Sequence, residues 1–126
     1  MRKDLPLMIV LGLLAAPRAV LHDLGLIHEG TGLNALLVFV PLLIWVVVAV
    51  TRSRSPVRLL LGAGAVYGLC LAVVHNALWH VETTVPEPLA RTAATVSSLA
   101  TGLAAGAICG GLAWLLTRRR STPTAP

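Results

Sequence analysis

The side chains best able to do chemistry in this chain interrupt long apolar segments. Arg18 and His22 lie one helical turn apart in the first segment, and His75 and Asn76 lie near the end of the third. Ionisable groups are costly inside a membrane, so such residues are functional candidates by default. The candidate polar set within the membrane is Arg18, His22, Asp23, Asn34, His75 and Asn76.

Arg18 is the most informative of these residues. If the first segment starts near residue 5 and continues to residue 27, Arg18 lies roughly 2 to 3 Å past its centre. Such a guanidinium needs an acceptor or a water-filled pocket. His22 shares its face, whereas Asp23 points about 140° away and is a poorer partner. Asn34, Asn76 and helix-end carbonyls are other possible acceptors; the alternatives are a structural ion pair or a side chain reaching outward to water.

The histidines and acids share one end of the expected helices. All four histidines and four of the five acids map there, and only Asp4 maps to the other end. Such an end could concentrate cations, bind a divalent transition metal or respond to pH. The spacings do not match the i, i+4 pattern of two imidazoles on one helix, so a metal site must be built between helices. The candidate metal ligands are His22, His28, His75, His80, Glu29 and Glu82.

Two other interpretations of these histidines stay open. His22 and His75 could supply opposed axial ligands to a haem, as imidazoles do in membrane cytochromes. Alternatively, the histidines and acids only decorate a membrane–water interface beside Trp79.

The amino-acid composition indicates whether the chain that carries these residues folds in water or in lipid. The chain has 126 residues, of which 56% are hydrophobic and 12% charged, and its mean hydropathy is +0.84. A soluble domain carries about a quarter charged residues, and disordered chains are poor in apolar residues. Both classes are therefore excluded, which leaves a protein whose solvent is lipid. Cys70 and Cys109 lie in apolar runs without metal-ligand spacing and are expected to be buried.

Four segments are long enough to span a hydrocarbon core, which takes roughly 20 apolar residues. The sequence predicts an all-α integral membrane four-helix bundle, antiparallel in an up-down-up-down order. A cleaved signal peptide is the alternative for the first segment, but its apolar run continues through Pro17 without a clean cleavage site. The single domain covers residues 1–120, with spans at about 5–27, 33–50, 58–80 and 92–117, followed by a disordered tail at 121–126.

Basic residues indicate the orientation, because short cytoplasmic loops are enriched in them. The basic clusters map to one side of the membrane, and outside the spans only Arg91 maps to the other side, so both termini are expected to be cytoplasmic. The sequence pI of about 10.7 is then a topology signal and requires no nucleic acid, although a weak attraction to anionic lipid is expected. The composition suggests a bacterial inner membrane. The clusters are Arg2 and Lys3, then Arg52, Arg54 and Arg58, then Arg118, Arg119 and Arg120.

Small residues spaced four apart predict where helices touch, because they allow close backbone approach in lipid. The fourth segment has more small-residue surface than one neighbour can cover, so we expect a homo-oligomer or another membrane-protein partner. The second segment is bulky and is expected to face mostly lipid. The predicted packing residues are Gly64, Gly68 and Ala72 in the third segment and Ser98, Gly102, Gly106 and Gly110 in the fourth.

Motifs for known chemistry are missing from the sequence. It contains no GxSxG, HExxH, Walker loop or CxxC, so the chain is not expected to be an enzyme, and no catalytic residue is assigned. Its layout resembles small multidrug-resistance exporters and fluoride channels. The first span, however, carries Arg18 in place of the exporters' central acid, and segment 62–79 lacks the channels' Thr-rich pattern.

The expected function is therefore non-enzymatic. We expect a membrane protein that binds or passes a small cation, metal or proton at its external side. One alternative is a structural or accessory subunit that docks through its small-residue faces. The other is a haem-binding electron carrier.

Overall fold

The computed structural model is all-helical and describes residues 4–80 and 82–120, apart from the side chain of Arg120. Arg2, Lys3 and the expected tail at 121–126 lie outside the described residues. The helices are α1 (Leu5–Asp23), α2 (Gly32–Arg52), α3 (Pro56–Ala77) and α4 (Glu87–Arg120). All four are long and apolar enough to cross a membrane, which indicates a membrane protein.

Local sequence explains where the helices begin and end. Helix α1 ends at Asp23, four residues before the expected end of the first span, because Gly25 adopts a φ of 70°. Helix α2 starts at Gly32, where the hydroxyl of Thr31 accepts a hydrogen bond from the backbone N–H of Asn34 at 3.3 Å. Helix α3 starts with Pro56 in the first turn, where no backbone donor is lost. Helix α3 ends at Ala77, three residues before the expected end of its span, and the other bounds that differ extend by one to five residues, the largest extension being the start of α4 at Glu87.

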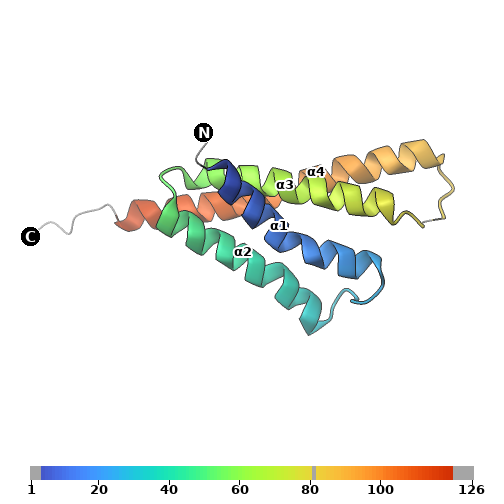
Figure 1. The fold of residues 1–126 in the computed structure, drawn as a ribbon, viewed down its shortest axis with the longest axis horizontal. Coiled ribbons are helices and arrows are strands. Elements are labelled where there is room, and N and C mark those ends of the chain that lie inside the picture. Colours follow the sequence, from blue (N-terminus) through green and yellow to red (C-terminus); the bar gives the residue numbers. More distant parts are fainter. Residues whose placement is uncertain (1–3, 81, 121–126) are drawn as a thin grey trace, which may run out of the picture.

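The ribbon reverses direction at each connection, and α3 and α4 lie side by side along their length (Figure 1). Helix α1 packs mainly on α3, and α2 contacts all three other helices. The first and last helices make no contact with each other among the described residues. Toward the α1–α2 connection, α2 diverges from α3 and α4 (Figure 1). The bundle is therefore open at this end.

Away from this end, large side chains are buried between the helices. Trp45 of α2, together with Leu59 and Leu60 of α3, is fully buried. The indole N–H of Trp45 donates to the backbone oxygen of Leu11 in α1 at 2.7 Å, and its ring meets Tyr67 of α3 edge-on at 6.2 Å. The expectation that α2 faces mostly lipid therefore missed Trp45, which joins three helices.

Glycines set the spacing between α3 and α4. A Cβ added at Gly68 would lie 3.0 Å from the Cα of Leu99, and one at Gly110 would lie 2.9 Å from the Cα of Val57. At Gly64 and Gly102 the added atom would press on the backbone of the facing helix even more closely. The small-residue stripes therefore meet each other within one chain. Gly111 of α4 meets no neighbour within 4 Å, and the expected homo-oligomer stays a prediction.

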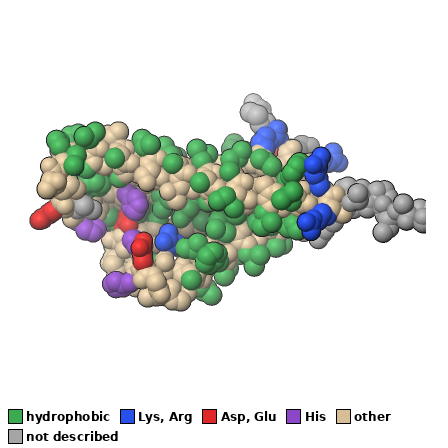
Figure 2. All heavy atoms as spheres, turned by 180° about the vertical axis from the view of Figure 1, so that it is seen from behind, with side chains coloured by type: hydrophobic (Ala, Val, Ile, Leu, Met, Phe, Trp, Pro, Cys, Tyr) green, Lys and Arg blue, Asp and Glu red, His purple; other side chains and the backbone are tan. Residues whose placement is uncertain are grey.

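Charge is distributed unevenly along the bundle (Figure 2). One end carries histidines and acids, and the other carries a group of Arg side chains (Figure 2). We call the first the histidine end and the second the basic end. At the basic end, Asp4 forms an ion pair with Arg58 at 3.0 Å.

Candidate functional site: a carboxylate between two histidines

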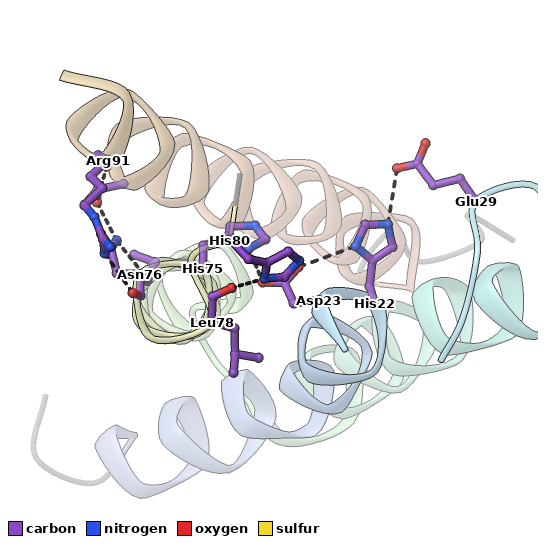
Figure 3. A network of polar contacts seen from close by, with 10 residues as sticks. His22, Asp23, Glu29, His75, Asn76, Leu78, His80 and Arg91 are labelled. Carbon is purple, nitrogen blue, oxygen red and sulfur yellow. Dashed lines mark hydrogen bonds and ion pairs between the residues drawn. The ribbon is translucent and has the colours of Figure 1, made fainter. Parts of the chain in front are cut away.

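Asp23 lies between two imidazoles at the histidine end (Figure 3). Its Oδ2 contacts Nδ1 of His75 in α3, and its Oδ1 lies 3.5 Å from Nδ1 of His22. The Asp23 side chain is only 11% exposed, whereas the two imidazoles are 36% and 37% exposed. A carboxylate accepts hydrogen bonds, so an Nδ1 that bonds to it carries the hydrogen. We call these three residues the carboxylate–histidine cluster.

A second acid reaches the cluster from the α1–α2 connection. Nε2 of His22 lies 3.8 Å from Oε1 of Glu29, whose side chain is 81% exposed. His22 therefore has a carboxylate near each ring nitrogen (Figure 3). An imidazole carries two donors only when it is protonated. Two acceptors therefore flank the His22 ring.

Arg18 lies on α1 one helical turn before His22, and its hydrogen-bond partner is the side-chain amide of Asn34. Its Nε donates to Oδ1 of Asn34 in the first turn of α2 at 2.9 Å. Among the described residues, Arg18 forms no ion pair with an acid. Because α1 ends at Asp23, Arg18 lies about 6 Å past the helix centre, farther out than the longer expected span implied. The guanidinium is thus held by one neutral acceptor, and its charge is not neutralised by a carboxylate.

Asn76 belongs to a separate contact between α3 and α4. Its amide nitrogen donates to the backbone oxygen of Ala72 at 2.8 Å and to the hydroxyl of Thr95 at 3.0 Å. Its backbone oxygen accepts from Arg91 at 2.9 Å, and the Arg91 guanidinium also lies over the ring of Trp79. Asn76 therefore fastens the histidine end of the α3–α4 pair and is not a partner of Arg18.

A cavity of about 710 Å³ adjoins the cluster. It is lined by all three cluster residues together with Leu24, Gly25, Leu78, Trp79, His80 and Ala94. A second cavity of about 290 Å³ lies beside Arg18 and also has His75 in its wall. The cluster thus faces space large enough for water.

The six candidate metal ligands do not gather into one site. His28 and Glu82 are exposed, and Nδ1 of His80 turns to the backbone oxygen of Leu78. Within residues 4–80 and 82–119, no group of three or more His, Cys, Asp or Glu side chains is placed to hold a metal ion. Only His22, His75 and Glu29 of that set lie at the carboxylate–histidine cluster, and Asp23 is the residue that joins them.

Sequence reasoning missed several residues of this region. Asp23 belongs to the predicted polar set, but its contact with His75 of α3 was not predicted. Ser97 and Thr101, which are not among the predicted site residues, line the cavity beside Arg18. The usable signal was their place in α4 beside Ser98 and Leu99, which face Gly68 of α3 where the small-residue stripes meet.

Comparison of this chain with protein-family models, curated proteins and solved structures gave no match. Its function is therefore argued from the geometry alone.

Proposed function

We propose that this chain is a pH-responsive membrane protein that binds a proton at the carboxylate–histidine cluster. The observation that carries the proposal is the placement of one largely buried carboxylate, Asp23, against Nδ1 of both His22 and His75. Histidine changes charge between pH 5 and 8, and a nearby carboxylate supplies the counter-charge. The adjoining cavity gives the proton a route to water.

A proton suits this site better than the other species considered. A metal ion needs more converging ligands than the described residues supply. A haem would require both imidazoles to leave Asp23 and face each other across an iron. The small-residue stripe that favoured an accessory role is covered by α3 within the chain. Binding a proton, in contrast, needs no rearrangement of Asp23, His22 and His75.

The side chains buried away from the histidine end restrict where the proton can be exchanged with water. Trp45, Leu59 and Leu60 fill the interior toward the basic end and are fully buried. The proton therefore enters and leaves at the histidine end, so the protein responds to the acidity of the water there. With the basic clusters on the cytoplasmic side, the histidine end faces outward from a bacterial inner membrane.

Trp79 provides a direct test, because it shares a cavity wall with His75 and His80. An imidazolium close to an indole lowers its emission. We expect the tryptophan emission of the purified protein in detergent to fall reversibly as pH is lowered from 8 to 5. Trp79→Phe should remove that change, whereas Trp114→Phe, which alters a ring beside Arg118 at the other end of α4, should preserve it. Emission that is constant with pH would contradict the proposal.

A further inference from the structure

The second cavity has the chemistry of an anion site. It lies between α1, α3 and α4, has a volume of about 290 Å³, and opens in the region where α1 and α4 make no contact among the described residues. Arg18, His75, Ser97, Ser98 and Thr101 supply its polar wall, and Leu71 and Ala94 supply the apolar part. The charge of Arg18 is not neutralised by an acid within the described residues.

Donors toward this cavity are free to bind a ligand. Nε of Arg18 is committed to Asn34, which leaves the terminal guanidinium nitrogens. Ser98 is only 5% exposed, and no hydrogen bond to its hydroxyl occurs in the described part of the chain. No buried side-chain oxygen or nitrogen there lacks a partner, so the hydroxyl of Ser98 reaches the cavity. Thr101 differs, because its hydroxyl donates to the backbone oxygen of Ser97 at 2.8 Å.

We infer that this cavity binds a small oxyanion carrying a single negative charge, such as a carboxylate or a phosphodiester. The guanidinium fork matches two oxygens of such a group, and the hydroxyls of Ser97 and Ser98 donate to the same group. One negative charge balances the one charge of Arg18. The volume admits a group of a few heavy atoms, supplied either by a free carboxylate or by the headgroup of an anionic lipid.

His75 joins this anion site to the proton site, and this coupling rests on the proposed function. Its Nδ1 is bonded to Asp23, so its Nε2 becomes a second donor only when the ring is protonated. The other titratable or charged groups around it are Arg18, His22 and Asp23 on α1 and His80 after α3, while α4 contributes Arg91 near Asn76. A bound anion and a bound proton therefore favour each other, and the coupling is reciprocal.

Thermal unfolding of the full chain in a neutral detergent tests the anion site. Acetate is the free probe, and phosphatidylglycerol added to the micelles is the lipid probe; phosphatidylcholine is the neutral lipid control. A ligand that binds only the folded state raises the melting temperature, and the rise grows with the logarithm of its concentration divided by its Kd. At pH 7 we expect stabilisation by acetate, by phosphatidylglycerol or by both, and none by phosphatidylcholine. Stabilisation by acetate alone identifies a free carboxylate, and stabilisation by phosphatidylglycerol alone identifies a headgroup.

Substitutions locate the binding. Arg18→Gln should weaken it by about tenfold or more, because a charge-assisted hydrogen bond is lost. Arg58→Gln, at the basic end, should leave it unchanged. If Arg18→Gln does not fold, Arg18→Lys retains the charge without the fork, and Ser98→Ala removes one hydroxyl; each should weaken binding by roughly threefold or more.

Two results would overturn the inference: no stabilisation by either anion, or stabilisation that survives Arg18→Gln and Ser98→Ala. Proton binding is measured separately, from the pH dependence of Trp79 emission without added anion. A failure of the proposed function can therefore be distinguished from a failure of the anion site. If that emission responds to pH while no anion binds, the anion site alone is wrong. If anions bind with equal affinity at pH 6 and pH 8, the coupling through His75 is wrong.

Discussion

Asp23→Asn is expected to make the stability of the protein strongly pH-dependent. In the wild type, a protonated His22 or His75 has the Asp23 carboxylate as its counter-charge. In the variant, protonation adds positive charge to a partly buried site that already contains Arg18. We expect the free energy of unfolding of the variant to fall relative to wild type by about 1 to 3 kcal/mol as pH is lowered from 8 to 5.5. Chemical unfolding in detergent at the two pH values measures this difference.

Asp4→Asn is the matched control for this substitution. It removes the same charge at the basic end, where Asp4 contacts the half-exposed Arg58. Exposed ion pairs contribute about 1 kcal/mol or less, and arginine does not titrate in this range. The effect of Asp4→Asn should therefore be small and equal at pH 8 and 5.5. If Asp23→Asn behaves in the same way, the imidazoles do not depend on Asp23.

Gly102→Leu is expected to destabilise the bundle by at least about 2 kcal/mol, because added core volume with no room to repack is costly. A Cβ at Gly102 would meet the backbone of Gly68, so even the first added carbon forces α3 and α4 apart. Helix propensity cannot be the cause, because leucine is a better helix former than glycine. Unfolding of the helical signal in a denaturing detergent measures the loss.

Gly111→Leu tests whether the loss of stability in Gly102→Leu comes from the contact with α3 and not from the size of the new side chain. Gly111 lies on the same helix, but an added Cβ there meets nothing within 4 Å. Its replacement by leucine should leave stability unchanged or slightly increase it. Equal losses at Gly102 and Gly111 would show that the α3–α4 contact is not set by the glycines.

The helices could be predicted from the sequence because length and hydropathy are properties of single segments. Their bounds shifted where a local feature intervened, as Gly25 does after Asp23. The small-residue stripes identified the faces of α3 and α4 that touch. They could not exclude a second copy as the partner, since a glycine stripe looks the same whichever helix covers it.

The sequence predicted which residues belong to the candidate site, but it did not predict which of them contact each other. Helical periodicity separates Arg18 from Asp23, and the structure likewise gives them different partners, Asn34 and His75. Which helix faces each side chain depends on packing between helices, which periodicity does not encode. Trp45 illustrates the same limit. It is fully buried in the bundle, but an apolar residue facing lipid would give the same sequence pattern.

Nitrogen-15 NMR of histidine-labelled protein in detergent tests most directly whether the carboxylate–histidine cluster binds a proton. His22→Gln and His75→Gln assign the two imidazole signals. We predict that at least one of them changes protonation state between pH 8 and 5 in the wild type, and that Asp23→Asn alters this change, because the counter-charge is gone. Identical titrations in wild type and Asp23→Asn would contradict the account.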